Sequence, residues 1–366
     1  MIIKRIALNG FRSYDFETAE FDPGTNVIYG ENAQGKTNLL EAVYMLAAGK
    51  SFRTRFDREL IGFGCDSAEI LADVHSHGRE QTVRIVLRQG QAKKISVNSV
   101  KKTASELSDT VTAVLFCPDD LNLIKEGAAA RRRLLDNAIS QIRPRYAEYL
   151  TEFNRYYENK LRILKDWREK PSLLDTLDDF SDGMCRMSAQ LIRYRAAFAA
   201  RLNEEAAPIH SEFSGAGEKL EIVYDTVSSV RDPMGSVKEI YYDLCDHLEK
   251  HRKAELESQQ CLTGAHKDDL IISINGQNAR SFASQGQTRT AALSIKLAER
   301  EIYLDETGEY PILLLDDVLS ELDTKRQEFV LNRIGGGQTL ITCCEDEGIS
   351  KRTGGKVLHV ENGRIR

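Results

Sequence analysis

The amino-acid sequence predicts an α/β protein with a mixed β-sheet into which a helical lobe is inserted, and three observations indicate this class. A short β-branched strand at residues 25–29 leads into a glycine-rich loop and then into a helix. An apolar strand at residues 311–317 ends in two carboxylates. Residues from about 128 to 206 have helical periodicity and no strand signal. Sheet-forming segments therefore open and close the chain.

The composition is that of a soluble globular protein with two or three domains. The chain has 366 residues, of which 41% are hydrophobic and 29% are charged. Its net charge of -6 gives no indication of nucleic-acid binding, so any such role must rest on local basic clusters. The first residues do not form a signal peptide, and no apolar run approaches the length of a membrane span. We expect a cytoplasmic protein without a membrane partner.

The cysteines do not indicate a disulfide framework or a zinc site. There are 7 of them, an odd number, and no pair has C-x-x-C spacing. Cys343 and Cys344 are adjacent and lie in an apolar run. We expect reduced and mostly buried thiols.

The glycine-rich loop has the spacing Gly-x-x-x-x-Gly-Lys-Thr of a phosphate-binding P-loop. Its glycines let successive N–H groups point at phosphate oxygens, and the helix N-terminus adds partial positive charge. Lys36 can reach the β- and γ-phosphates of ATP, and the Thr37 hydroxyl can ligate Mg²⁺. The alternative is a chance match in a glycine turn, which the flanking strand and helix disfavour. The expected nucleotide-binding residues are Gly30, Glu31, Asn32, Ala33, Gln34, Gly35, Lys36, Thr37 and Asn38.

Strand signals dominate the first third of the chain. Alternation predicts a strand over residues 2–8, a turn at Asn9-Gly10 and a second strand over 14–21. The helix after the P-loop ends at Gly49. An antiparallel meander follows, and a buried strand closes this part. The expected strands of the meander and the buried strand are 69–75, 81–88, 95–100 and 111–116.

Helices follow. Pro144 starts a long amphipathic helix and Pro171 separates it from another, which predicts an antiparallel helical hairpin. Its Met and aromatic stripe is expected to be core. Beyond the hairpin, the sequence predicts strands at 219–225, 270–275, 311–317, 339–344 and 356–361, and helices at 237–256 and 287–304.

The strand ending in Asp316 and Asp317 has the pattern of a Walker B site. Asp316 is expected to hold Mg²⁺ opposite Thr37, and Asp317 to act as a general base on the attacking water. The alternative is an ordinary acidic turn at a strand end. The presence of a P-loop in the same chain favours the Walker B interpretation.

A further candidate anion site lies at the start of the helix after Ser284-Gln285-Gly286-Gln287. Ser284 suits the N-cap, and the helix amides suit an anion, although on its own this segment is better explained as a plain capped helix start. The run Ser320-Glu321-Leu322-Asp323 follows the Walker B pattern. The order of all these motifs is more specific than any one of them.

Together these motifs resemble the heads of ABC-type ATPases of the SMC family, and within it the bacterial recombination mediators. The resemblance covers nearly the whole chain and implies an ABC-type P-loop ATPase head with an inserted helical arm. It implies ATPase parts at 1–121 and 257–366 and a mainly helical lobe at 122–256. It is carried by residues 8–14, 30–37, 129–136, 263–270, 284–287, 314–317 and 320–323.

The resemblance implies an ATP-dependent homodimer in which two heads enclose two ATP molecules. Ser284, Gly286 and Gln287 would contact the γ-phosphate held by the other copy, and Asp323 would lie in a loop crossing the interface. It also implies slow, DNA-stimulated ATP hydrolysis in recombinational repair and replication. The partners would be single-stranded, double-stranded and gapped DNA, and proteins of the RecO and RecR type.

Three departures from the broader ABC pattern favour a slow switch over a motor. The signature, which is the run Ser284-Gln285-Gly286-Gln287, has Gln285-Gly286 in place of two glycines. Asp317 stands where a catalytic glutamate is usual, and its carboxylate is about one methylene further from the water. Thr342 follows the strand at the place where transporters carry a switch histidine. The glutamine loop is expected in Phe116 to Asp120.

Local basic clusters are the candidate DNA contacts, although each of them also fits a solvated charged face. The Arg131–Arg133 triplet has a second alternative, which is to brace the lobe or the nucleotide site. His266 with Asp268 and Asp269 suggests either a metal site or hydrogen bonding at an interface or active site. The candidates for DNA contact are Arg53, Arg55, Lys93 and Lys94, and additionally Arg58, Lys101, Lys102 and the triplet.

Two other functions fit the P-loop. The chain could be the ATP-binding subunit of a membrane transporter, which the inserted lobe and the missing switch histidine disfavour. It could also be a structural clamp in which ATP holds the dimer and hydrolysis is incidental.

Overall fold

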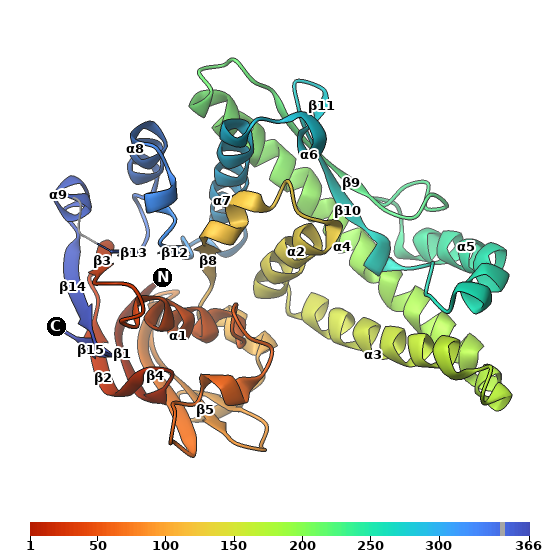
Figure 1. Cartoon of the computed structure of the whole chain (residues 1–366), viewed down its shortest axis with the longest axis horizontal. Helices are drawn as coiled ribbons and strands as arrows, with labels where there is room; N and C mark the ends of the chain where they lie inside the picture. Colours follow the sequence, from red (N-terminus) through yellow and green to blue (C-terminus); the bar gives the residue numbers. More distant parts are fainter. Residues whose placement is uncertain (345–347) are drawn as a thin grey trace. The chain divides into compact units, whose positions relative to one another are not determined.

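The computed structural model describes residues 1–344 and 348–366, and these form two compact units (Figure 1). The first unit contains residues 1–122 and 289–366, and the second contains residues 123–288. The first boundary lies next to the expected one, after residue 121. Residues 257–288, which we expected in the ATPase part, lie in the second unit because their strand pairs with β9 (Leu220–Asp225) of the helical lobe.

A mostly parallel sheet forms one layer of the first unit. Its strand order is β15-β14-β3-β13-β12-β8, and all neighbours are parallel except β15, which pairs antiparallel with β14. Because parallel strands share one carboxyl edge, the P-loop after β3 and the carboxylates at the end of β12 meet there. The strands are β3 (Thr25–Tyr29), β8 (Ala113–Phe116), β12 (Ile312–Asp316), β13 (Thr339–Cys343), β14 (Lys356–Glu361) and β15 (Arg364–Ile365).

An antiparallel sheet of order β2-β1-β4-β5-β6-β7 completes the first unit's strands. The turn predicted at Asn9-Gly10 is wrong, because β1 continues to Phe11. The strand predicted over 95–100 is also wrong. Asn98 and Ser99 have left-handed φ values of 49° and 67°, and such a turn folds the segment into the β6–β7 hairpin. The strands are β1 (Ile2–Phe11), β2 (Tyr14–Glu20), β4 (Ser67–Ser76), β5 (Arg79–Arg88), β6 (Lys94–Val97) and β7 (Val100–Lys102).

Helix α1 (Lys36–Ala48) joins both sheets through one hydrophobic core. Leu39, Leu40 and Val43 are buried with side chains of the antiparallel sheet, such as Ile6, and of the parallel sheet, such as Leu314. Gly49 ends the helix with φ 65°, as predicted. The unit's other helices are most of α7 (Gln285–Thr307), α8 (Thr324–Arg333), α9 (Ile349–Thr353), and the 3₁₀ turns η1 (Asp57–Leu60), η2 (Ser105–Asp109), η3 (Pro118–Asn122) and η6 (Leu319–Glu321).

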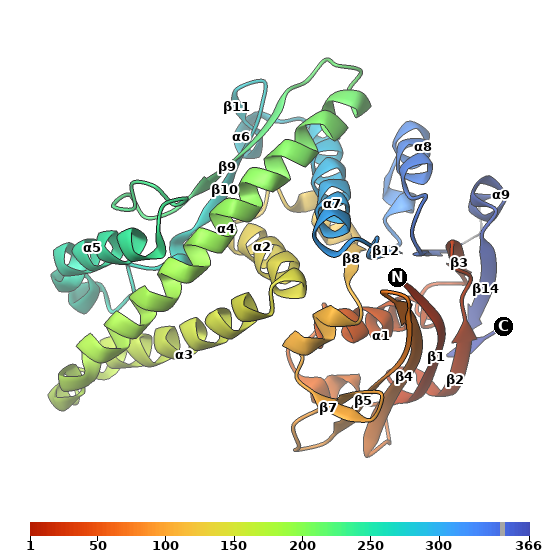
Figure 2. The same ribbon diagram turned by 180° about the vertical axis from the view of Figure 1, so that it is seen from behind.

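The second unit is built on the predicted helical hairpin. Helices α3 (Pro144–Asp166) and α4 (Leu177–Phe213) lie side by side, as both views show (Figures 1 and 2), and Pro144 is the first residue of α3. A small sheet of order β11-β10-β9 packs on α4. The remaining elements are α2 (Ala128–Ile142), η4 (Pro171–Thr176), α5 (Val237–Ser258), η5 (Ala265–Lys267), β10 (Asp269–Ile274), β11 (Gln277–Asn278) and α6 (Ala279–Phe282).

A buried arginine links the parts of the second unit. The Arg195 guanidinium, on α4, donates at 2.7 Å to Asp268 Oδ2, to Ala265 O and to Asp136 Oδ1. Asp268 is fully buried and also accepts a hydrogen bond from the Tyr224 hydroxyl on β9. Burial raises the pKa of Asp268, and Arg195 opposes that shift. This network ties α2, α4 and β9 to the segment before β10.

No helix among residues 1–344 and 348–366 is both long enough and apolar enough to cross a bilayer.

Replacing Arg195 by Met should lower the free energy of unfolding by about 3–5 kcal/mol, because it leaves the buried Asp268 carboxylate without its charge partner. Urea unfolding followed by circular dichroism measures this loss. The control is Arg186→Met on the same helix, whose side chain is 65% exposed and should change stability by less than about 1 kcal/mol. Equal effects of the two substitutions would show that the Arg195 network does not hold the unit together.

Candidate nucleotide-binding site

At Gly30 and Gly35 the P-loop backbone takes conformations that residues with a Cβ adopt only with strain. Gly30 has φ 155°, and a Cβ there would lie 2.2 Å from the carbonyl oxygen of Val360 on β14. Gly35 has φ 121° directly before α1. The glycine spacing of the motif therefore reflects both the curl of the loop and its close contact with the neighbouring strand.

Lys36 and Tyr14 fix the two ends of the loop. The Lys36 ammonium is 2.6 Å from Gly30 O and 3.0 Å from Glu31 O, so the side chain folds back across the loop. The Tyr14 hydroxyl donates to Gly35 O at 2.9 Å. Burial raises the pKa of Tyr14, so this hydroxyl stays a donor. Lys36 thus lies where it can exchange backbone carbonyls for phosphate oxygens.

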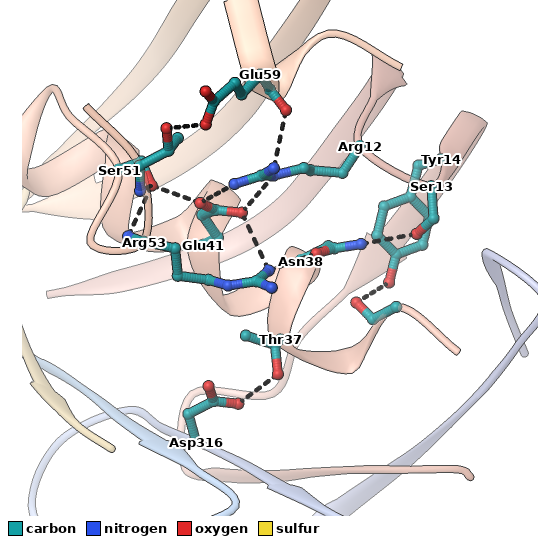
Figure 3. Close-up of polar contacts among 12 residues, drawn as sticks. Arg12, Ser13, Tyr14, Thr37, Asn38, Glu41, Ser51, Arg53, Glu59 and Asp316 are labelled. Carbon is teal, nitrogen blue, oxygen red and sulfur yellow. Dashed lines mark hydrogen bonds and ion pairs between the residues drawn. The ribbon is translucent and has the colours of Figure 1, made fainter. Parts of the chain in front are cut away.

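Thr37 and Asp316 are in direct contact, although 279 residues separate them (Figure 3). The Thr37 hydroxyl donates to Asp316 Oδ1 at 2.9 Å. Thr342 donates to the same oxygen at 2.9 Å. Burial raises the pKa of Asp316, and these two hydroxyl donors partly oppose that shift. The expected pair of magnesium-binding side chains is therefore together at the sheet edge.

Asp317 has two features that set it apart from an ordinary turn residue. Its φ is 51°, a left-handed value that is uncommon outside glycine, and its N–H donates to Thr342 Oγ1 at 2.9 Å. Its Oδ1 atom is buried without a hydrogen-bond partner. A carboxylate oxygen held in this way can accept a proton from a water molecule. Thr342 lies within β13 rather than after it, because the strand extends to Cys343.

The outer part of the P-loop contacts segments that the sequence did not suggest. The Gln34 side chain accepts a hydrogen bond from the N–H of Asn362 at 2.6 Å, and its carbonyl accepts one from Gly363 N–H at 3.0 Å. The Cys344 thiol lies 3.0 Å from Asn32 Oδ1. The turn between β14 and β15 thus supports the loop.

A buried carboxylate on α1 organises the far side of the site (Figure 3). Glu41 is fully buried and accepts two hydrogen bonds of 2.8 Å from Arg12 and another from Ser51. Helical periodicity gave no reason to select Glu41. The only signal was Arg12, which lies in one of the runs that carry the family resemblance. The pair fixes the β1–β2 turn against the helix that begins at Lys36.

The four basic residues proposed to contact DNA have different surroundings. Arg53 donates to Asn38 Oδ1 at 2.9 Å and lies 3.6 Å from Glu41, so it is held beside the P-loop helix. Lys93 forms a 3.0 Å ion pair with Asp57. Arg55 and Lys94 are exposed. Contact of these residues with DNA stays a prediction.

Two arginines of the triplet, Arg131 and Arg132, form contacts within the helical lobe, which fits the alternative in which the triplet braces this lobe. Arg131 is buried and forms an ion pair with Asp269, with Nε 2.6 Å from Oδ1. Arg132 donates to Asp268 O at 2.7 Å. Arg133 is exposed. Arg131 therefore cannot reach a DNA phosphate without leaving its partner.

The signature residues form a reciprocally capped helix start in the second unit. The Ser284 hydroxyl accepts from Gln287 N–H at 3.2 Å, and Gln287 Oε1 accepts from Ser284 N–H at 2.9 Å. Lys125 donates to Ala283 O at 2.8 Å and so fixes the segment before Ser284. The predicted N-cap is thus present, and Gly286 lies in the first turn of α7.

Two other predicted elements lie in the first unit. Asp323 is the N-cap of α8 and accepts from Arg326 N–H at 3.0 Å. The region proposed for the glutamine loop follows β8, where the Cys117 N–H donates to Asp120 Oδ2 at 2.9 Å. Because β8 is parallel to β12, this turn lies at the same sheet edge as the P-loop.

His266 takes part in packing. Its Nε2 is 2.9 Å from Cys261 O, and its ring packs against that of Tyr157, with centroids 4.7 Å apart and planes tilted by 42°. Burial lowers the pKa of His266 to about 4, and the nearby cations of Lys267, Arg132 and Lys160 add to the shift. Within the described ranges 1–344 and 348–366, no group of three or more His, Cys, Asp or Glu side chains is arranged to hold a metal ion. Hydrogen bonding, and not metal binding, is the role that the contacts support.

The fold and the site define the class of protein. The family model described as "RecF/RecN/SMC N terminal domain" matches residues 2–363. The Smc head domain of Pyrococcus furiosus, solved with the C-terminal domain of ScpA, superposes with a TM-score of 0.56 at 16% identity over 100% of this chain and 95% of that chain. The chain therefore has the ABC-type ATPase head fold of the SMC family.

Closer relatives narrow this class. The DNA replication and repair protein RecF of Agathobacter rectalis is 40% identical over 100% of this chain and 99% of its own, and that of Acetivibrio thermocellus is 39% identical with the same coverage. Solved structures of the recombination mediator RecF with ATPrS and with ATP, in the RecFOR pathway, match at 34% identity. They have TM-scores of 0.92 and 0.90 and cover 100% of this chain and 97% and 96% of theirs. The chain belongs to the RecF family of DNA replication and repair proteins. This membership argues against the alternative that the chain is the ATP-binding subunit of a membrane transporter.

Lowering the pH from about 6.5 to 4 should destabilise the protein by up to about 3 kcal/mol through His266 alone. The pKa of His266 is depressed in the folded state, so its contribution is fully present above pH 6.5 and is lost as pH falls toward 4. Urea unfolding across this range should show a smaller slope for His266→Gln than for the wild type. Identical slopes for wild type and His266→Gln would contradict the prediction.

Proposed function

We propose that this protein is an ATP-dependent DNA-binding protein of recombinational repair and replication, which dimerises on ATP and hydrolyses it slowly as a switch. The observation that carries the proposal is the Thr37–Asp316 hydrogen bond of 2.9 Å. It joins a P-loop to a buried strand-end carboxylate, which is the arrangement that nucleotide hydrolysis needs. Structures of RecF relatives with ATP support the same function.

ATP would lie against the P-loop backbone and the N-terminus of α1. The N–H groups of residues 30–38 would bind the phosphates, and the Lys36 ammonium would leave Gly30 and Glu31 to contact them. Gln34 and Asn32 are already tied to neighbouring segments, so the loop is held in shape before the nucleotide arrives. Preorganisation of this kind lowers the entropy cost of binding.

The side chains at the site also fit a magnesium ion. A hydroxyl and a carboxylate, those of Thr37 and Asp316, are the hard oxygen ligands that Mg²⁺ prefers, and they already touch. When bound, Mg²⁺ would neutralise charge on the phosphate oxygens. Thr342 would hold Asp316 in its ligating orientation.

Hydrolysis would depend on Asp317 as the base that orients and deprotonates water. Its buried, unpartnered Oδ1 and its fixed backbone support this role. An aspartate is about one methylene shorter than the glutamate usual at this position, and a small loss of alignment lowers the rate strongly. Slow turnover suits a switch whose ATP-bound state must persist.

The dimer would be closed by the signature turn of a second copy. Ser284, Gly286 and Gln287 stand at the start of α7, where helix amides and their partial positive charge attract an anion. Asp323 would lie near the same interface. ATP would then stabilise the dimer by mass action, and hydrolysis would release it.

DNA would be bound mainly through its phosphates, with little sequence selectivity and strong salt dependence. Arg55 and Lys94 are exposed and suit this role best, whereas Arg53 and Lys93 would have to loosen existing contacts. We expect binding to single-stranded, double-stranded and gapped DNA, DNA-stimulated hydrolysis and partners of the RecO and RecR type. Membership of a DNA repair family supports these expectations and a cytoplasmic location.

Replacing Lys36 by Arg should abolish ATP-dependent dimerisation on duplex DNA, because a guanidinium cannot take the place of the compact ammonium within the loop. Light scattering with ATP, with a nonhydrolysable analogue and without nucleotide measures the dimer. The control is Lys4→Arg, a lysine with a half-exposed side chain on β1. If Lys36→Arg dimerises on DNA as well as the wild type, the switch mechanism is wrong.

Replacing Asp317 by Asn should slow ATP hydrolysis by at least about 100-fold while ATP-dependent dimerisation persists, because the general base is lost and the phosphate ligands remain. Phosphate release measures the rate, and the exposed Asp15→Asn on β2 is the control. A DNA-repair assay in cells that carry Asp317→Asn distinguishes a cycling mediator from a structural clamp. A cycling mediator fails with Asp317→Asn, whereas a structural clamp with incidental hydrolysis keeps working.

A further inference from the structure

The signature turn is closed by its own side chains. Ser284 and Gln287 cap each other through two hydrogen bonds, so the backbone N–H groups of both residues, which are donors that a phosphate would need, already have acceptors within the turn. Thr288 adds a third contact, because its hydroxyl donates to Ser284 O at 2.8 Å. A phosphate that approached this turn would have to compete with these internal partners.

A carboxylate outside the signature determines how Gln287 is oriented. Gln287 Nε2 donates to Glu218 Oε1 at 2.8 Å. An ionised carboxylate only accepts hydrogen bonds, so Glu218 selects the amide orientation in which nitrogen faces Glu218 and oxygen faces Ser284 N–H. Glu218 lies between α4 and β9, far from the signature in sequence, and its side chain is 24% exposed.

A buried histidine in turn holds Glu218. His210, at the end of α4, is fully buried, and its Nε2 is 3.1 Å from Glu218 Oε2. Its Nδ1 is buried with no hydrogen-bond partner, which fits a neutral ring that donates from Nε2. Burial lowers the pKa of His210, and Glu218 opposes the shift only in part. Both carboxylate oxygens of Glu218 therefore have fixed partners.

We propose that Glu218, supported by His210, is a positioning residue that keeps the signature turn capped by its own chain and so sets how much ATP is needed to close the dimer. The inference rests on the proposed role of Ser284, Gly286 and Gln287 in binding ATP held by a second copy. Closure requires Gln287 to release Ser284 N–H and turn toward the phosphate. Glu218 opposes that rotation by retaining the amide nitrogen.

The charge of Glu218 acts in the same direction. Its carboxylate contacts a residue that would touch the γ-phosphate, so two negative groups come close when the dimer forms. Helix α7 attracts the phosphate through its N-terminal amides, and Glu218 reduces that attraction. Removing the charge of Glu218 should therefore favour dimer closure in two ways. It weakens the hydrogen bonding that keeps Gln287 capping Ser284, and it ends the repulsion between the carboxylate and the γ-phosphate.

The test is the ATP concentration that gives half-maximal dimerisation of the full chain, measured by light scattering for Glu218→Gln. Loss of one charge-assisted hydrogen bond should lower that concentration by about 3- to 10-fold. The rate of hydrolysis per closed dimer should stay unchanged, because Glu218 does not touch the reacting atoms. Glu221→Gln, an exposed glutamate on β9, is the matched control and should behave as wild type.

Glu218→Asp provides a second variant that keeps the charge but withdraws it from Gln287. It should shift the ATP concentration in the same direction by a smaller factor. If either variant needs as much ATP as the wild type or more, Glu218 does not restrain the signature turn and the inference is overturned. If the wild type itself does not dimerise with ATP, that result contradicts the proposed function, and not only the role of Glu218.

Discussion

The hydrogen bond between Thr37 and Asp316 is the contact on which the site depends. It exists because β3 and β12 are parallel neighbours of the same strand, β13, so that both end at one edge. The chain can leave this sheet after β8, form an entire helical unit, and return without disturbing the edge. The two halves of the candidate site therefore come together because of the strand order in the sheet, and not because they are close in sequence.

Buried polar groups carry much of the remaining organisation. Glu41 in the first unit and Asp268 in the second are fully buried, and each is matched by an arginine. Isolated buried charges are strongly unfavourable, so each pair fixes the geometry of the segments that supply it. Glu41 and Arg12 set the β1–β2 turn against α1, and Arg195 sets β9 and the β10 segment against α4. The same logic extends to the signature turn, where Glu218 and His210 constrain a single glutamine.

The sequence was informative wherever the signal was local. The P-loop, the strand ending in Asp316, the helix starts at Pro144 and Ser284 and the stop at Gly49 follow from spacing, capping and proline or glycine geometry. Apart from Thr37 with Asp316, which two recognisable motifs supply, it did not indicate which distant segments contact each other. Glu41 has the appearance of a solvent-facing residue until Arg12 is placed beside it. The hairpin at Asn98 depends on two left-handed residues within an apolar pattern, and Gln34 gives no sign of its contact with Asn362.

The pairing of β3 has a consequence for biosynthesis. This strand, which delivers the P-loop, has β13 on one side and β14 on the other, and the loop itself contacts Asn362 across 328 residues. During translation, β3 leaves the ribosome long before either neighbour exists, and a lone strand is not stable in water. A nascent chain should therefore acquire nucleotide affinity late and abruptly, once residues 339–361 have cleared the exit tunnel.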